Sequence, residues 1–216
     1  MSIQRRSREQ MAARVARDIS EGSYVNLGIG LPTLVSNFLP TDLDIFLHSE
    51  NGILGMGPAP ARGKEDPELI NAGKQPVTLL RGGCFFHHGD SFAMMRGGHL
   101  DVCVLGAFQV SVRGDIANWH TGAPDAIPAV GGAMDLAIGA RHIYVMMEHT
   151  TKSGESKLVE RCTYPVTGIA CVERIYTDLA VIEVTPRGLV AAEITDGLSF
   201  EELARMTAAP LLRASE

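Results

Sequence analysis

The chain has 216 residues, of which 45% are hydrophobic and 20% charged, so we expect one globular domain over residues 1–216 with a sizeable core. The net charge of −6 argues against a nucleic-acid partner, which would favour a basic surface. No apolar run reaches the roughly 18 residues of a membrane helix, and the basic N-terminus is not followed by an apolar signal core. We therefore expect a cytoplasmic protein.

Hydrophobic periodicity and turn residues divide the chain into alternating strands and helices. In chain order, we expect helices at residues 7–21, 33–39, 91–96 and 133–138 and after Ser199, and strands at 24–28, 44–48, 76–80, 100–105, 109–112, 142–147, 180–184 and 189–194. Capping boxes at Ser7 and Ser199 are expected to begin the first and last helices, and the last two strands are expected to form a hairpin. We expect a turn at 81–83, and the strand at 109–112 is expected to continue the sheet. Polar, Gly-rich or Pro-rich stretches at 55–75, 117–129 and 148–160 are expected to be loops. The early strand–helix–strand order predicts an α/β fold: an open, mostly parallel sheet with flanking helices. Ligands bind such sheets at the carboxyl ends of the strands.

Glu50 follows the strand expected at 44–48, on a turn of small and polar residues. A glutamate on a turn is usually a solvated surface residue. The turn, however, lies at the ligand-binding edge of the expected sheet, and its small neighbours Ser49 and Gly52 let a ligand approach. A carboxylate there can attack an acyl carbon and divide one difficult step into two. We interpret Glu50 as a candidate nucleophile.

Two glycine turns are candidate ligand-binding elements. Gly28 and Gly30 follow a strand, but Thr33 stands where a dinucleotide-binding fingerprint has its third glycine, which disfavours a nicotinamide cofactor. Their backbone amides could still approach an acyl or phosphate group. Gly131 and Gly132 precede a helix, and unhindered N–H groups there could form an oxyanion hole, although a plain tight turn has the same pattern.

The histidines and cysteines show no metal-binding pattern. None of the seven histidines or four cysteines has metal-ligand spacing, so we expect no metal site and reduced cysteines. His48, at a strand end, is interpreted as a packed or hydrogen-bonded core residue. Lys152, Lys157 and Arg161 lie in the 148–160 region or next to it and could meet phosphates, or could simply be solvated.

Residues 47–55 (Leu-His-Ser-Glu-Asn-Gly-Ile-Leu-Gly) resemble the active-site signature of the B subunit of the 3-oxoacid CoA-transferase family. Further stretches resemble the same family in the same order: residues 26–30, 69–74, 96–99, 131–136 and 147–150. The resemblance extends over residues 8–210 and implies the α/β fold that these transferases share with sugar-phosphate isomerases.

Within the family, the chain is most similar to the members that act on 3-oxoadipate in the catabolism of aromatic compounds. Residues 85–88 (Phe-Phe-His-His) and 118–123 (Asn-Trp-His-Thr-Gly-Ala) carry this similarity, because acetoacetate-using relatives usually have Trp-Met-Ile-Pro-Gly at the second stretch. A site that pairs the distal carboxylate of 3-oxoadipate should reject the shorter acid. The expected candidates for that role are His120 and Thr121, supported by His87 or His88.

The resemblance also implies a mechanism and a partner. Glu50 would attack succinyl-CoA to form a mixed anhydride, the CoA thiolate would return to give a glutamyl-CoA thioester, and 3-oxoadipate would then take the CoA. Asn51 and Gly52, together with Gly131 and Gly132, would form the active-site turns, with an N–H near Gly132 facing the oxyanion. No metal or organic cofactor is implied. An A subunit would complete the site, as an A2B2 heterotetramer.

Three alternatives remain open on the sequence. An acetoacetate-specific transferase has the same nucleophile, a scaffold subunit would leave the nucleophile to its partner, and a nicotinamide oxidoreductase is a remote third. Replacing Glu50 by alanine separates the first two, because a scaffold would keep its activity.

Overall fold

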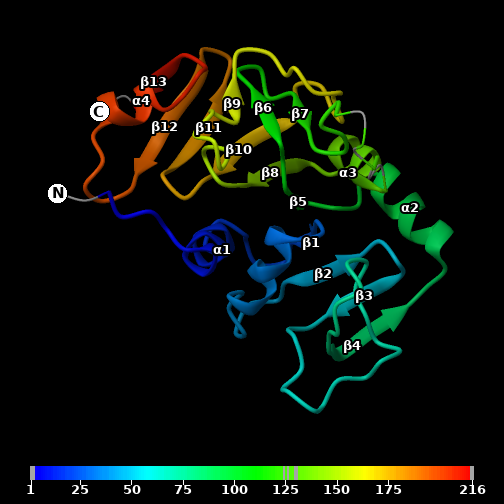
Figure 1. Cartoon of the computed structure of the whole chain (residues 1–216). Helices are drawn as coiled ribbons and strands as arrows, with labels where there is room; N and C mark the ends of the chain where they lie inside the picture. The colour runs from blue at the N-terminus through cyan, green and yellow to red at the C-terminus, as the bar shows by residue number, and fades with distance from the viewer. Residues whose placement is uncertain (1–2, 124, 126, 129–130, 215–216) are drawn as a thin grey trace.

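A ten-stranded sheet forms the centre of the computed structural model, which describes residues 3–123, 125, 127–128 and 131–214 (Figure 1). Its strand order is β13-β12-β11-β10-β8-β5-β1-β2-β3-β4. The five strands from β10 to β2 are parallel, whereas β3 and β4 at one side and β11 and β12 at the other join by antiparallel pairing. The expected open, mostly parallel α/β sheet is confirmed.

The main sheet is built from these strands: β1 (Tyr24–Leu27), β2 (Phe46–Ser49), β3 (Ile53–Met56), β4 (Leu79–Phe85), β5 (Val102–Leu105), β8 (His142–Met146), β10 (Val172–Tyr176), β11 (Ala180–Thr185), β12 (Gly188–Ile194) and β13 (Leu211–Arg213). A second sheet has the order β7-β6-β9, from β6 (Gln109–Ser111), β7 (Ile116–Ala117) and β9 (Leu158–Val159). The helices are α1 (Arg8–Ala16), the 3-10 helix η1 (Leu31–Asn37), α2 (His88–Arg96), α3 (Ala133–Gly139) and α4 (Phe200–Arg205).

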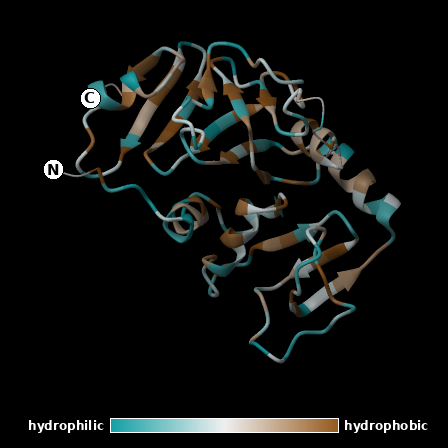
Figure 2. Ribbon diagram, in the orientation of Figure 1, coloured by the Kyte–Doolittle hydropathy of each residue, from teal (hydrophilic) through white to brown (hydrophobic). Residues whose placement is uncertain are grey.

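Strand β5 shows why the sheet has a hydrophobic layer on each face. All four of its residues are buried, and successive side chains point to opposite faces. Val102 and Val104 join one core cluster, and Cys103 and Leu105 join the other. A continuous apolar run is typical of a parallel strand that is covered on both sides. In Figure 2 the hydrophobic residues accordingly concentrate on the strands and the hydrophilic ones on the connections.

Helix α1 covers one face of the sheet and begins as its sequence predicts. Ser7 accepts a hydrogen bond from the Gln10 backbone N–H, and the Gln10 side chain accepts one from the Ser7 N–H, which completes the capping box. The helix ends at Ala16, however, and not at residue 21 as expected. Beyond it the chain turns, and the Asp18 side chain leaves the helix pattern to accept hydrogen bonds from Tyr176 and Arg174 in β10.

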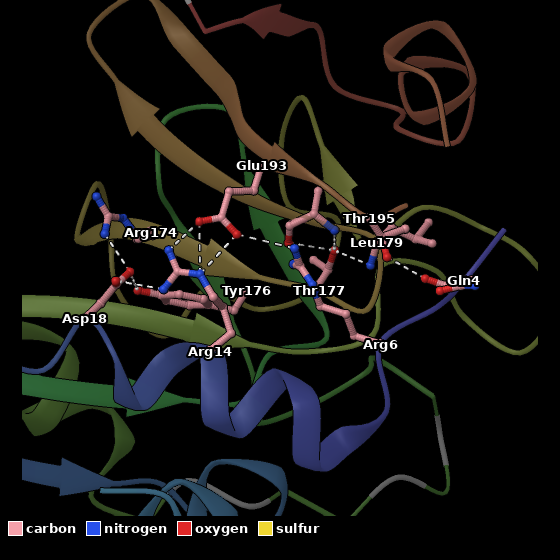
Figure 3. Close-up of polar contacts among 11 residues, drawn as sticks. Gln4, Arg6, Arg14, Asp18, Arg174, Tyr176, Thr177, Leu179, Glu193 and Thr195 are labelled. Carbon is pink, nitrogen blue, oxygen red and sulfur yellow. Dashed lines mark hydrogen bonds and ion pairs between the residues drawn. The ribbon is translucent and has the colours of Figure 1, made fainter. Parts of the chain in front are cut away.

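The polar contacts of α1 reach across to β12 (Figure 3). Arg14 donates to both carboxylate oxygens of Glu193 and, at 2.7 Å, to Asp18. Arg6 lies 3.3 Å from the same Glu193 carboxylate. The N-terminal helix is therefore attached both to the central strands and to an antiparallel strand near the other end of the chain.

The region from residue 53 to residue 85 differs from its expected structure. β3 is an unexpected strand, and the expected strand at 76–80 is found at 79–85, so Gly82 and Gly83 lie inside β4 and do not form a turn. A side chain at Gly83 would come within 3.0 Å of the Leu54 carbonyl oxygen, so glycine permits the close approach of β3 and β4.

Several other elements also differ from their expected type, bounds or position. The helix expected at 33–39 is a 3-10 helix with Pro32 in its first turn, and α2 begins at His88 because the His87 ring accepts a hydrogen bond from the Gly89 N–H. The strand at 109–112 belongs to the second sheet and does not continue the main one. The strands β7, β9, β10 and β13 were not expected, whereas the hairpin of β11 and β12 is confirmed.

Membrane-spanning helices and metal-binding clusters are absent from the described residues. No described helix is long and apolar enough to cross a membrane. Within the same part of the chain, no group of three or more His, Cys, Asp or Glu side chains is placed to hold a metal ion.

Candidate active site

Glu50 occupies a tight turn between two strands of the main sheet. β2 pairs in parallel with β1 and returns through residues 50–52 as the antiparallel strand β3. Gly52 closes the turn by donating its N–H to the Ser49 carbonyl oxygen at 2.9 Å. Its φ of +108° and the contact that a Cβ would make with the Phe86 carbonyl oxygen both require glycine. The turn therefore fixes Glu50 at the carboxyl end of β2.

A cavity of about 570 Å³ lies at this edge of the sheet and includes Glu50 in its lining. The residues that end four neighbouring parallel strands all line it: Leu27 (β1), Ser49 (β2), Leu105 (β5) and Met146 (β8). The volume is in the range of small-molecule sites, and the position is the one at which open parallel sheets bind ligands.

The surroundings of Glu50 favour a reactive carboxylate. Burial raises the pKa of Glu50, and the negative charge of Asp135 acts in the same direction. The electrostatic interaction with His88 and a hydrogen bond from the Gly132 N–H oppose this shift. A partly desolvated carboxylate is a stronger nucleophile than a fully hydrated one, while the Gly132 N–H keeps part of its charge stabilised.

Gly132 brings the backbone at the start of α3 against Glu50. It is the residue before the helix, with φ −81° and ψ 3°, and its carbonyl oxygen accepts the first helical hydrogen bond from Leu136. A Cβ at this position would overlap the Glu50 Oε2 atom. The absent side chain is what lets the Gly132 N–H reach the carboxylate. Gly131, with φ +44°, also lines the cavity.

A buried polar chain supports the strand end that carries Glu50. The Asn26 Nδ2 amide donates to the His48 carbonyl oxygen at 3.2 Å and lies 3.0 Å from its ring Nδ1, so Nδ1 accepts and Nε2 carries the proton. Nε2 then donates to Ser91 Oγ at 2.9 Å. Burial lowers the pKa of His48 to about 4, so this ring is neutral at neutral pH. His48 is thus a hydrogen-bonded core residue, in agreement with its expected role.

The loop that follows β3 is attached to the Glu50 turn. The Asn51 Nδ2 amide donates to the Ile70 carbonyl oxygen at 2.8 Å, and the Ala72 N–H donates to Ser49 Oγ at 3.0 Å. Ala72 lines the cavity, whereas Asn51 and Gly52 do not. Among the described residues, Asn51 and Gly52 therefore shape the turn and its loop and do not contact the cavity.

The other residues proposed from the sequence divide into two groups. Gly28 lines the cavity with Glu50, Gly131 and Gly132. Five others are absent from its described lining, namely Gly30, His87, His88, His120 and Thr121. His88 interacts electrostatically with Glu50 and packs on Phe92, with ring centroids 4.8 Å apart. The His120 ring accepts a hydrogen bond from the Gly122 N–H and lies against Trp119.

Several cavity residues were not singled out as site residues from the sequence. Asn26 and Asn118 come from separate elements, and Asn118 reaches the site because its amide donates to the Gly106 carbonyl oxygen at 3.1 Å. Arg8 and Glu148 also line the cavity. Of the three loop cations considered from the sequence, only Lys157 is in the described lining. Hydrogen-bond partners far apart in the chain have no local pattern from which they could be recognised.

A family model with the description "Coenzyme A transferase" matches residues 8–205 of the chain. The chain belongs to the coenzyme A transferase family. The expected family resemblance is therefore confirmed, and the Glu50 turn lies within the matched residues.

Relatives within this CoA-transferase family match over nearly the whole chain. The chain is 66% identical to the B subunit of 3-oxoadipate CoA-transferase of Acinetobacter baylyi over 216 residues, which is 100% of both chains. It is 70% identical over 207 residues to the Pseudomonas putida protein of the same name, covering 96% of this chain and 97% of the other. The B subunit of a probable succinyl-CoA:3-ketoacid coenzyme A transferase of Bacillus subtilis is 46% identical over 203 residues, or 94% of each chain.

Solved structures of CoA-transferases share the fold. An acyl-CoA transferase of Escherichia coli O157:H7 superimposes with a TM-score of 0.75 at 19% identity, and the match covers 99% of this chain but 43% of that enzyme. Glutaconate coenzyme A-transferase of Acidaminococcus fermentans gives a TM-score of 0.71 at 15% identity, covering 99% of this chain and 91% of the other. At these identities the likeness establishes the α/β fold.

Proposed function

We propose that this chain is the nucleophile-bearing subunit of an enzyme that moves CoA from succinyl-CoA to 3-oxoadipate. The observation that carries the proposal is the Glu50 carboxylate, which lines a cavity at the strand ends, is partly desolvated, and accepts a hydrogen bond from the Gly132 N–H. The relatives named as B subunits of 3-oxoadipate CoA-transferase support the choice of acceptor.

The first half of the proposed reaction loads CoA onto Glu50. A carboxylate oxygen of Glu50 attacks the thioester carbon of succinyl-CoA, the C–S bond breaks, and CoA leaves as a thiolate from a glutamyl–succinyl anhydride. The thiolate attacks the Glu50 carbonyl carbon, and succinate leaves. The Gly132 N–H contacts the resting carboxylate, which supports a role for it in stabilising the oxyanion that forms at this carbon.

The second half runs the same steps toward the acceptor. The carboxylate of 3-oxoadipate attacks the Glu50 thioester, CoA thiolate leaves, and its return to the acyl carbon releases 3-oxoadipyl-CoA and free Glu50. Because every nucleophile is an anion, no step requires a proton transfer. This agrees with the neutral, fully hydrogen-bonded His48 ring beside the site, and the scheme uses no metal or organic cofactor.

A second subunit is part of the proposal. The relatives are named as B subunits, which implies an A subunit, and we infer an A2B2 complex with the active site completed at the contact between the two chains. The His120 and Thr121 region, His87 and His88 remain proposed acyl-binding residues that such a contact would bring into use. A cytoplasmic location remains a prediction from the sequence.

An assay of the complex tests this function. The chain is co-purified with its A subunit, and the transfer of CoA from succinyl-CoA is measured with 3-oxoadipate and with acetoacetate as acceptors. We expect 3-oxoadipate to have the higher kcat/KM and Glu50→Ala to abolish transfer to both. A preference for acetoacetate would favour the 3-ketoacid activity named in the Bacillus subtilis relative, and full activity of Glu50→Ala would identify a scaffold subunit.

A further inference from the structure

The cavity that contains Glu50 is also lined by three other charged residues. Arg8, Glu148 and Lys157 line this cavity, whereas much of the remaining surface is apolar. The Arg8 guanidinium lies 3.5 Å from the Glu148 carboxylate, so these two charges are matched. Two positive charges against one negative charge leave a net charge of +1 on these three residues, and Lys157 is the cation without an ion-pair partner among them.

The Lys157 backbone is held in place on both sides. Its N–H donates to the His149 carbonyl oxygen at 3.0 Å, and its carbonyl oxygen accepts a hydrogen bond from the Val110 N–H at 3.0 Å. Lys157 immediately precedes β9, which pairs with β6 in the second sheet. The side chain is therefore presented to the cavity from a fixed point and not from a free loop.

The Lys157 ammonium has unused hydrogen-bond donors. Burial lowers the pKa of Lys157, while the charges of Glu148 and Asp178 oppose this shift from a distance. Asp178 is engaged by Arg5 and by the His149 N–H at 2.8 Å. Lys157 itself forms no ion pair or side-chain hydrogen bond with any residue that the structure describes. A half-buried cation without a carboxylate partner gains strongly from a ligand that supplies one.

We propose that Lys157 binds the distal carboxylate of dicarboxylic acyl groups, and so determines acyl specificity in both halves of the reaction. The inference rests on the proposed function. Succinyl-CoA and 3-oxoadipate each carry a free carboxylate at the end of the chain away from the reacting carbon. With Glu50 and Gly132 at the reacting carbon and Lys157 in the lining of the same cavity, the ammonium of Lys157 would bind the distal carboxylate of the donor and then that of the acceptor. An acyl group that ends in methyl leaves the ammonium unmatched and is disfavoured.

The test compares two donors that differ mainly in this carboxylate, using the complex with the A subunit. Formation of the enzyme–CoA thioester is followed in single turnovers with succinyl-CoA and with butyryl-CoA, which has a methyl group in place of the carboxylate. Lys157→Met is expected to lower the ratio of kcat/KM for succinyl-CoA over butyryl-CoA by about 10-fold to 100-fold, mainly through the succinyl-CoA KM. Lys157→Arg should keep most of the preference.

Matched variants make the outcome decisive. Lys152→Met removes an exposed lysine from the same region and should leave the ratio unchanged. Equal losses on both donors in Lys157→Met, or a selective loss in His120→Met with none in Lys157→Met, would overturn the assignment. If Lys157→Met does not assemble, Lys157→Gln is measured in its place. If the wild-type complex forms no thioester from either donor, the proposed function itself fails, which is a separate result.

Discussion

At the residue scale, Glu50 and Gly132 form one unit, because the carboxylate occupies the space where a side chain at position 132 would lie. The backbone at Gly132 has φ −81° and ψ 3°, which L residues adopt. The need for glycine at this position therefore comes from the site and not from the fold. A methyl group here displaces the Glu50 carboxylate and has Phe92 Cζ as its other close neighbour, at 3.3 Å.

Gly132→Ala tests this coupling. The added Cβ displaces the Glu50 carboxylate from the Gly132 N–H, so thioester formation should slow by about 100-fold or more, the usual effect of losing one oxyanion donor. The free energy of unfolding should change by less than about 1 kcal/mol, because the backbone angles suit alanine. Single-turnover kinetics and urea unfolding measure the two quantities.

Gly106→Ala is the matched control. Gly106 also lines the cavity, but a Cβ there would have Pro32 Cδ at 4.0 Å as its nearest neighbour. We expect less than a threefold loss of rate in this variant. A Gly132→Ala enzyme as fast as the control would show that the Gly132 N–H does not act on Glu50.

The sequence indicated some of these residues and not others. Glu50 and Gly132 each have a local signal, a carboxylate after a strand and a glycine pair before a helix. The partners of His48 have none, because Asn26 and Ser91 lie 22 and 43 residues away and only the fold brings them together. Lys157 was one of three equivalent loop cations until the pairing of β9 with β6 placed it at the cavity.

At the scale of elements, α1 is held by ion pairs as well as by its apolar stripe. The Arg14 side chain is 19% exposed. It connects Glu193 in β12 with Asp18, which lies just past the C-terminal end of α1. Hydrogen bonds from Arg14 lower the pKa of Glu193, so the carboxylate is favoured in the folded chain. Ion pairs with this degree of burial contribute more than fully exposed ones.

Arg14→Met should lower the free energy of unfolding by about 2 kcal/mol, because it leaves two partly buried carboxylates without their shared partner. Arg17→Met changes an exposed arginine next to the same helix and should have an effect within about 0.5 kcal/mol. Urea unfolding at neutral pH measures both variants. If Arg14→Met and Arg17→Met have the same free energy of unfolding, packing alone attaches α1 to the sheet.

Elements with strong local signals were predicted best. The capping boxes at Ser7 and Ser199 and the hairpin of β11 and β12 have clear sequence patterns and were found as expected. β3 and β4 were missed or misplaced because glycines usually mark turns, and here Gly83 instead permits two backbones to approach closely. The close approach of two strands cannot be predicted from the sequence of one segment alone.

At the scale of the whole molecule, the two hydrophobic layers enclose two neutral histidines. Burial lowers the pKa of His48 and of His149 to about 4. His149 lies 3.1 Å from Thr177 Oγ1 and 2.9 Å from Thr207 Oγ1, so both ring nitrogens have partners. The unfolded chain, in which histidine titrates near 6.5, binds more protons than the folded chain between about pH 4 and pH 6.5.

Stability should therefore fall as the pH is lowered through this window. Between pH 7 and pH 5 we expect each of the two histidines to remove about 2 kcal/mol from the free energy of unfolding. His149→Gln should roughly halve the dependence, whatever its absolute stability. Urea midpoints across this range provide the measurement, and an unchanged slope in His149→Gln would show that His149 is not a source of the pH dependence.

The fold class followed from the order of strands and helices, because parallel pairing is the usual arrangement for that order. The arrangement of segments that are distant in the sequence did not follow from this order. β6, β7 and β9 form a second sheet that covers the core, and no local pattern distinguishes their residues from strands of the main sheet. The cavity lining includes four strand ends, the start of α3 and the residue before β9, so its full composition depends on the complete fold.

Trapping the enzyme–CoA thioester tests the role of Glu50 as the nucleophile without relying on a variant. The complex with the A subunit is incubated with succinyl-CoA, treated with borohydride to reduce the thioester, digested and mapped by mass spectrometry. We expect Glu50 alone to be converted to the alcohol, and only when succinyl-CoA is present. An active complex in which Glu50 stays unmodified, or in which another carboxylate is reduced, would contradict this role.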